Sequence, residues 1–308
     1  MTLLFKGLKK SPIPFFSRDS TQAVLMILPM LIGFFLFTYV PILYIIRYCV
    51  FNYDGIRPAV FNGFDNFIRL FVRDKAFWES FLNTLFLGGK IVIEIPLALL
   101  FAVLLHMSLR GTTFFRVSLF LPTIISTAIV GLVFSLMFAA YRGVINTMLI
   151  HIGLIKEPIA WMGSKWTALL VLMLASIWCY VGINMIFFLM ALQSIPKELN
   201  DCATLDGCRG LRRFLKITLP LIGPIFRVVL LNAIIGSLKV NDLVLASTNG
   251  QPAGKTEVSM TYIFKFFFGY SSRRVEIGYA SAMSVIMGIF LGVVTFIYLK
   301  FSKRLNFD

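Results

Sequence analysis

Charged residues are scarce in this chain. Only 14% of its 308 residues are Asp, Glu, Lys or Arg, whereas 58% are hydrophobic. A typical soluble domain carries about 25% charged and about 45–50% apolar residues. The sequence therefore lacks the polar surface that a soluble globule of this length needs. It predicts an integral membrane protein that crosses the bilayer several times.

Histidine and cysteine are also rare. The two histidines, His106 and His151, are far apart, and the four cysteines show no Cys-x-x-Cys spacing. We therefore expect no metal site and no Ser-His-Asp arrangement, and we interpret the cysteines as small packing residues. The sequence also lacks a Gly-x-x-x-x-Gly-Lys-Ser/Thr phosphate loop. We expect that the chain is not an enzyme, does not hydrolyse ATP alone and binds no cofactor.

Acidic residues are half as numerous as basic ones. Lys and Arg number 29 against 14 Asp and Glu, which gives a formal net charge of +15. Such an excess could indicate a nucleic-acid partner. However, the basic residues are not spread evenly. If the number of spans is even and both termini are inside, the inside segments carry most of the basic residues, as the positive-inside rule describes. We therefore expect cytoplasmic N- and C-termini and no nucleic-acid partner.

Long apolar segments account for most of the chain. A bilayer core of about 30 Å requires about 20 apolar helical residues, and an open sheet cannot span lipid. The sequence predicts an all-α polytopic membrane protein with six transmembrane helices, at Ser20–Ile46, about Ser80–His106, Val117–Tyr141, Trp166–Pro196, about Ile222–Ser247 and Ile277–Leu299. Residues 21–300 are then the transmembrane domain, 1–20 a cytoplasmic N-terminal segment and 301–308 a cytoplasmic tail.

The segment 195–220 is a short polar, charged stretch between two apolar runs. Pro196 lies where a helix could begin, and Glu198 and Asp201 follow in the first turn, where acids favour the positive end of the helix dipole. Gly207 permits a left-handed turn that would end this helix. We predict a helix near 198–208, a break at Gly207, and a basic helix that returns to the membrane.

The same segment resembles the "EAA" cytoplasmic loop of bacterial ABC importer permeases. That pattern is Glu-Ala-Ala, three residues, Gly, nine residues, Ile, one residue and Leu-Pro. This chain has Asp201-Cys202-Ala203, Gly207, Ile217 and Leu219-Pro220 at the same spacing. In the family the loop forms the coupling helix that docks on the ATP-hydrolysing subunit. The resemblance therefore implies a set of coupling residues: Glu198, Asp201, Cys202, Ala203, Asp206, Gly207 and Arg212.

Other motifs resemble the sugar-uptake, maltose-transporter-like branch of that family. Phe61–Phe67 with Phe77-Trp78 and Asn83-Thr84 resembles its segment before the second span. Asn249–Glu257 resembles its "GGP-x-x-x-T-E" loop, and Gly278–Ala282 resembles the "GxAxA" start of its last helix. Each motif is weak alone, but their order along nearly the whole chain favours the resemblance.

The resemblance implies a type I ABC importer permease in a bacterial cell membrane, one half of a translocation path for sugars or oligosaccharides. The implied partners are a second, non-identical permease, two ATP-binding subunits that hold ATP and Mg, and an extracytoplasmic solute-binding protein. The outer loops at about 48–79, 142–165 and 248–275 are the natural docking surface for that binding protein. A permease for another solute class and a self-contained secondary transporter remain alternatives. A membrane-embedded enzyme would need catalytic residues that the sequence does not show.

Charges inside apolar spans are costly and often functional. Lys239 and Asp242 are three residues apart and would share one helix face, either along the transport path or as a local ion pair near the outer surface. Lys239 could also meet the carboxylate of an acidic sugar. The residues that we predict to line the path are Tyr180, Asn184, Asn232, Ser237, Lys239, Asn241 and Asp242.

Two further pairs have a structural alternative to a role in transport. Lys90 and Glu94 have i, i+4 spacing, which favours a mutual salt bridge over contact with substrate. Tyr180 and Asn184 share one face of the fourth span, where an aromatic ring could stack on a sugar. Aromatic residues make up 15% of the chain, however, so most of them face lipid or the core.

Overall fold

The structure is a computed structural model that describes residues 18–107 and 111–302. The predicted segments 1–20 and 301–308 lie mostly outside these residues, so their boundaries remain predictions. The α-helices are α1 (Arg18–Phe34), α2 (Val40–Tyr48), α3 (Asp65–Ile68), α4 (Lys75–Gly88), α5 (Ile91–His106), α6 (Thr112–Ile124), α7 (Thr127–Met137), α8 (Val144–His151), α9 (Lys165–Gln193), α10 (Lys197–Leu205), α11 (Gly210–Arg213), α12 (Leu219–Leu221), α13 (Gly223–Leu238), α14 (Asp242–Ser247), α15 (Ser259–Phe268) and α16 (Ile277–Ser302).

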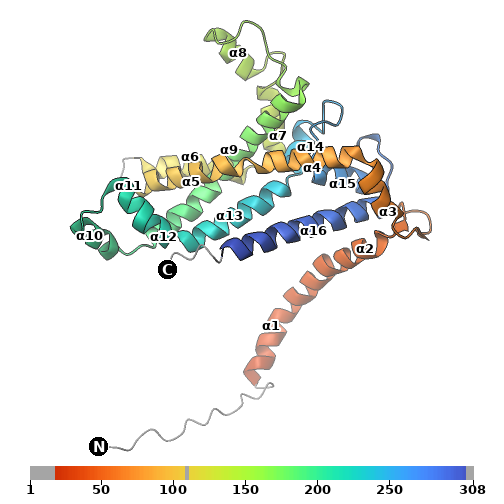
Figure 1. Cartoon of the computed structure of the whole chain (residues 1–308), viewed down its shortest axis with the longest axis horizontal. Coiled ribbons are helices and arrows are strands. Elements are labelled where there is room, and N and C mark those ends of the chain that lie inside the picture. The colour runs from red at the N-terminus through yellow and green to blue at the C-terminus, as the bar shows by residue number, and fades with distance from the viewer. Residues whose placement is uncertain (1–17, 108–110, 303–308) are drawn as a thin grey trace, which may run out of the picture.

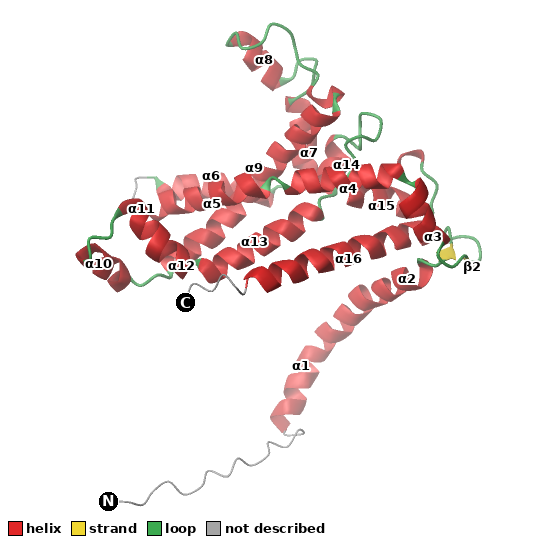
Figure 2. Ribbon diagram, in the orientation of Figure 1, coloured by secondary structure: helices red, strands yellow, loops and turns green. Residues whose placement is uncertain are grey.

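Short π- and 3₁₀-helical segments and one small hairpin complete the described chain. The π-helical segments are η1 (Phe35–Tyr39), η2 (Arg69–Arg73) and η4 (Phe214–Thr218), and the 3₁₀ segments are η3 (Trp161–Gly163) and η5 (Tyr270–Ser272). Strands β1 (Phe51–Asn52) and β2 (Val60–Phe61) pair antiparallel. Figure 2 shows how small this hairpin is beside the helices. The prediction of an all-α fold is confirmed.

Four helical stretches of the described chain are long and apolar enough to cross a membrane. They are Gln22–Tyr48, Lys75–His106, Lys165–Gln193 and Ile277–Ser302. Two bent helix pairs, α6 with α7 and the stretch Gly210–Leu221 with α13, raise the number to six if each pair counts as one span. The predicted six spans therefore correspond to these six stretches, with corrections to the third and fifth.

The third span is not a continuous helix. α6 and α7 meet at an angle of 100°, because Ile125 and Ser126 adopt extended backbone with ψ of 136° and 132°. Pro122 lies near the end of α6 and cannot donate a backbone hydrogen bond. The Oγ1 of Thr123 donates to the carbonyl of Cys179 at 2.8 Å and ties the end of α6 to α9.

The fifth span is broken at both ends of α13. A bend of 75° separates it from the stretch Gly210–Leu221, and Gly223 and Pro224 follow at the first positions of α13, where proline is tolerated. At its far end the helix stops at Leu238, and α14 begins only at Asp242. The predicted continuous helix from Ile222 to Ser247 is therefore wrong.

One apolar core joins α5, α9 and α13. Ala98 and Ala102 of α5 are fully buried against the core side chains of α9, among them Met185 and Phe188. Small residues allow helix backbones to approach closely where lipid supplies no hydrophobic driving force. Gly182 likewise allows the backbones of α6 and α9 to approach closely, because a Cβ at this position would lie 2.1 Å from the carbonyl oxygen of Leu119.

The first span diverges from the bundle. Figure 1 shows α1 pointing away from the other helices, with α2 approaching the start of α16. No residue of the most apolar window within Gln22–Tyr48 is buried in the chain. Exposed side chains such as Met26, Met30 and Phe37 therefore require an apolar environment outside this chain, lipid or protein.

Candidate functional site

The helix predicted near 198–208 is present as α10. It runs from Lys197 to Leu205, with Pro196 as its N-cap and Glu198 in its first turn. Gly207 follows with φ of 72°, the left-handed conformation that glycine adopts without strain. The amide of Cys208 donates to the carbonyl of Ala203 at 2.8 Å, and that of Gly207 donates to Thr204 at 3.1 Å. These two bonds form a Schellman C-cap, which explains why the helix ends there.

α10 projects beyond the ends of the spans and exposes one face. Figure 1 places it at the extremity of the molecule, past the ends of α5 and α9. Glu198, Asp201, Cys202 and Leu205 have helical spacing that puts them on one face, and all four are exposed. The Leu205 side chain is 88% exposed. The exposed face of α10 therefore combines two carboxylates with an uncovered leucine.

The remaining coupling candidates occupy other positions. Ala203 lies on the opposite face of α10 and is buried, so its small size matters for packing. Asp206 is the C-cap residue and Gly207 the left-handed residue, both exposed. Arg212 lies on α11 and is exposed beside the return to the membrane. The structure thus separates the predicted set into an exposed face and residues that shape the turn.

A buried polar cluster links α5 to α9 inside the bundle. The Lys90 ammonium lies 2.6 Å from Oε2 of Glu94, with both side chains at most 4% exposed. The predicted salt bridge is therefore confirmed. The Nδ2 of Asn184 donates to Oε1 of Glu94 at 2.6 Å. The Lys90 ammonium also lies 4.5 Å from the ring centroid of Tyr180.

The contacts in this cluster decide whether Tyr180 and Asn184 are accessible to a ligand. Asn184 is only 6% exposed and its amide is engaged by Glu94, so it lies in the protein core rather than on an open surface. Tyr180 is 37% exposed, with its ring close to Lys90. Lys90 itself stands at the junction of α4 and α5, directly after Gly89. Of the two candidates, Tyr180 is the one with surface available for a ligand.

The other path candidates surround the break after α13. Lys239 caps α13, and Asn241, the N-cap of α14, has φ of −139° and ψ of −66°. The expectation that Lys239 and Asp242 share one helix face is therefore wrong, because α13 ends at Leu238 and α14 begins only at Asp242. Within the described residues the two side chains form no ion pair with each other. Both are exposed.

Unpartnered polar atoms mark the same break. Ser237 is buried with no hydrogen-bond partner for its Oγ among the described residues, and Oδ1 of Asn241 is likewise buried and unpartnered there. The Nδ2 of Asn241 donates to Asp242 at 3.0 Å. Asn232 lies earlier on α13, before the break, and is exposed. Irregular backbone within a membrane occurs where it is buried in protein or lines a water-filled cavity.

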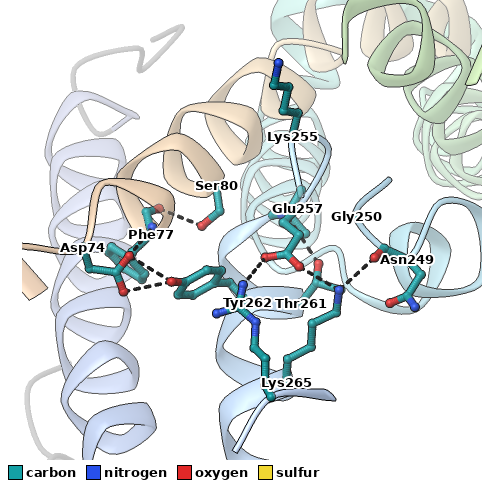
Figure 3. A network of polar contacts seen from close by, with 12 residues as sticks. Asp74, Phe77, Ser80, Asn249, Gly250, Lys255, Glu257, Thr261, Tyr262 and Lys265 are labelled. Atoms are coloured by element: carbon teal, nitrogen blue, oxygen red, sulfur yellow. Dashed lines mark hydrogen bonds and ion pairs between the residues drawn. The ribbon is translucent and has the colours of Figure 1, made fainter. Parts of the chain in front are cut away.

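A second network of polar contacts fixes the other end of the bundle, away from α10. Figure 3 shows Glu257 paired with Lys265, whose ammonium lies 2.7 Å from Oε1 and also donates to the carbonyl of Asn249 at 2.8 Å. Arg273 lies 3.3 Å from the other oxygen of Glu257. The loop 249–257 is thereby tied to α15 and to the segment after it.

The sequence motifs of this end contact one another. The Nδ2 of Asn83 donates to the carbonyls of Lys255 and Glu257, both at 2.8 Å. Oγ1 of Thr84 accepts from the amide of Ser259 at 2.9 Å. Asn83 and Thr84 of α4 therefore hold the Glu257 loop, and the two motifs form one structural unit.

Asp74 anchors the same unit. It caps α4 by accepting from the amide of Phe77 at 3.0 Å, and it accepts hydrogen bonds from the hydroxyls of Tyr262 at 2.8 Å and Tyr279 at 2.6 Å, as Figure 3 shows for Phe77 and Tyr262. Burial, and then the Asp74 carboxylate, raise the pKa of the Tyr262 phenol, although Arg273 lowers it in part. The phenol therefore stays protonated and remains a donor.

The comparison with known proteins decides the family. Residues 94–307 match the model of the binding-protein-dependent transport system inner membrane component family. The chain belongs to this family. It is therefore an inner-membrane transport permease and not a catalytic subunit.

Relatives of the permease match it along most of their length. It is 30% identical over 289 residues to the probable ABC transporter permease protein YesP of Bacillus subtilis, covering 93% of this chain and 92% of that protein. It is 32% identical to the lactose transport system permease protein LacF of Rhizobium radiobacter, covering 77% and 79%. A crystal structure of a bacterial ABC transporter involved in the import of the acidic polysaccharide alginate matches with a TM-score of 0.80 and 26% identity, covering 94% of this chain and 97% of that chain.

Several residues of the permease that organise these sites are not among those predicted from the sequence. Asp74, Lys265 and Arg273 hold the 249–257 loop and its surroundings, yet they come from separate segments. A signal for Asp74 exists, since Asp is a preferred N-cap residue before a helical pattern. The Glu257–Lys265 pair has no local signal, because eight residues and a loop-to-helix transition separate the partners.

Proposed function

We propose that this permease forms half of the translocation path of an ATP-driven importer for sugars or oligosaccharides. The observation that carries the proposal is α10, a projecting capped helix whose exposed face presents Glu198, Asp201, Cys202 and Leu205. A chain with no phosphate loop needs energy from elsewhere. A separate subunit that binds ATP and Mg would receive this face and transmit its own motion through α10 to the spans.

The sugar class is supported by the relatives and by the chemistry of the broken fifth span. LacF is named for lactose transport, and the alginate transporter structure is named for an acidic polysaccharide. Around the break, Asn232, Lys239 and Asp242 are exposed, and Ser237 and Asn241 hold unpartnered oxygens. Such a polar set suits ligand hydroxyls, and the exposed ammonium of Lys239 suits a carboxylate on an acidic sugar. Tyr180 offers a partly exposed ring on α9.

We infer that the partner of this bundle is a second permease. The first span contributes no buried residue to its most apolar window, and it leaves the bundle with apolar side chains exposed. A second permease would cover part of this surface, and lipid would cover the rest. The two permeases would then enclose the broken fifth span, with both termini of this chain on the cytoplasmic side with α10.

The extracytoplasmic binding protein would dock at the opposite end. The family is defined by dependence on a binding protein. At that end, the contacts of Asn83, Glu257 and Asp74 hold the loops on a rigid base. A preorganised surface loses less conformational freedom on binding. The polar network would therefore keep the outer loops in position for docking.

Reconstitution tests this function directly. The full chain, with the proteins that co-purify with it, is placed in proteoliposomes, and uptake of neutral and acidic oligosaccharides is measured with the binding protein outside. We expect uptake only with ATP on the α10 side. Uptake that proceeds without ATP, or the absence of an ATPase from every preparation, would show that the chain is a self-contained transporter.

A further inference from the structure

An apolar groove of about 790 Å³ lies between α5 and the chain that returns from α10 to the membrane. Its walls are formed by Leu99, Leu100 and Val103 of α5, and by Leu211 and Phe214 of α11 and η4. Ile195, just after α9, also lines the groove. The groove is uncovered, since Leu211 is 71% exposed and Leu100 is 52% exposed. Its apolar lining does not suit a sugar.

The length of the groove matches one leaflet of a bilayer. Its α5 wall extends from Pro96 to His106, which at 1.5 Å per helical residue is about 15 Å. Half of a hydrocarbon core of about 30 Å is about 15 Å. An acyl chain that lies along this wall would therefore run from the midplane to the headgroup level, and its polar end would lie at the α10 end of the bundle.

Basic residues line that end. His106 and Arg213 are both part of the groove wall, and Arg212 and Lys216 are neighbours on the same returning segment. Arg213 forms no ion pair with another described residue. The sequence also contains no acidic residue between Asp206 and Asp242. Basic pockets between spans at a membrane surface bind anionic lipid headgroups, whereas a neutral headgroup gains nothing comparable from an unpaired arginine.

From this combination we infer that the groove is a binding site for an anionic phospholipid. One acyl chain lies against Leu99, Leu100 and Val103, and the phosphate contacts Arg213 and His106. The wall that the lipid contacts includes η4, a π-helical segment of the kind that is frequent at functional sites.

A tryptophan in the groove tests the site. In the purified complex, Phe214→Trp places a fluorophore on the groove wall, and quenching by phosphatidylglycerol with brominated acyl chains is compared with quenching by brominated phosphatidylcholine. The signal of the unsubstituted complex is subtracted, since the four native tryptophans remain. One cation near an anionic headgroup contributes about 1 kcal/mol, so we expect about a fivefold preference for phosphatidylglycerol.

Two further variants in the Phe214→Trp background separate the possibilities. Arg213→Gln removes the groove cation and is expected to abolish the preference. Arg57→Gln, on an exposed outer loop, is the matched control and keeps it. Equal quenching by both lipids would show unselective contact with bulk lipid, and no quenching by either would show that the second permease covers the groove. Either result overturns the inference. Mass spectrometry of phospholipid retained by the wild-type complex after detergent exchange provides an independent measurement, in which phosphatidylglycerol must exceed its share of the membrane.

Discussion

Asn184 donates a hydrogen bond to Glu94 across 2.6 Å and so joins α9 to α5 inside the bundle. The same carboxylate is paired with Lys90 at 2.6 Å. A buried ion pair need not stabilise a protein relative to apolar side chains, but the loss of one partner leaves a buried charge alone. The cluster therefore depends on its members being present together.

Removal of Glu94 alone should be more damaging than removal of the pair. We expect Glu94→Leu to lower the free energy of unfolding by about 3–5 kcal/mol, because Lys90 stays buried without its carboxylate. The double variant Lys90→Met/Glu94→Leu should recover most of this loss. Thermal unfolding of the purified chain in detergent measures both. The exposed pair Arg57–Asp54 is the control, and its removal should change stability by about 1 kcal/mol or less. A double variant as unstable as the single one would contradict this account.

Asn83 should be needed to order the 249–257 loop. Asn83→Leu removes the donor to the carbonyls of Lys255 and Glu257, and a buried acceptor without its partner costs about 1–3 kcal/mol. We expect faster hydrogen exchange in residues 254–259, measured by mass spectrometry, and little change in α9. Asn52→Leu replaces an exposed amide and serves as the control. Unchanged exchange in this loop would show that Asn83 does not hold it.

Lys239 should distinguish acidic from neutral substrates. Lys239→Met removes an exposed cation at the break after α13. A hydrogen bond with a charged group contributes about 1.5–3 kcal/mol, so the KM for uptake of an acidic oligosaccharide should rise at least about tenfold. The KM for a neutral one should not change. Lys156→Met, in an exposed outer loop, is the matched control. Equal effects on both substrates would remove Lys239 from substrate recognition.

Charge reversal on the exposed face of α10 should uncouple the importer. Asp201→Lys is expected to lower uptake at least about tenfold, because reversing a charge at an interface removes its electrostatic complementarity to the partner. The chain should still insert and fold, since Asp201 is exposed and belongs to a projecting helix. Uptake and ATP hydrolysis stimulated by the loaded binding protein are measured together. Glu157→Lys reverses an exposed outer-loop carboxylate as the control. Normal uptake by Asp201→Lys would refute the role of this face.

Local patterns predicted those parts of the structure that local physics determines. Lys90 and Glu94 pair because i, i+4 spacing on a helix brings their side chains together. α10 ends before Gly207 because that residue accepts a left-handed backbone. The apolar segments located the spans because hydropathy reports residence in lipid.

Backbone breaks inside apolar segments could not be predicted in the same way. Hydropathy is equal for a straight helix and for two helices at 100°, so the extended residues Ile125 and Ser126 left no signal in composition. Lys239 and Asp242 have the spacing of one helix face. However, α13 ends at Leu238, before both residues. The pairing of Asn184 with Glu94 depends on the packing of α9 against α5, which is a relation between segments 90 residues apart.

The most direct test of the central claim uses a native cysteine. Of the four cysteines, Cys202 is exposed on the outward face of α10, Cys49 and Cys179 are buried, and Cys208 is intermediate. In a Cys208→Ser background, the rate of maleimide labelling at Cys202 is measured in membranes stripped of peripheral subunits, before and after the purified ATPase is added back. The account predicts at least about a tenfold fall in the labelling rate when the ATPase binds. An unchanged rate with the ATPase bound would show that this face of α10 is not the coupling surface.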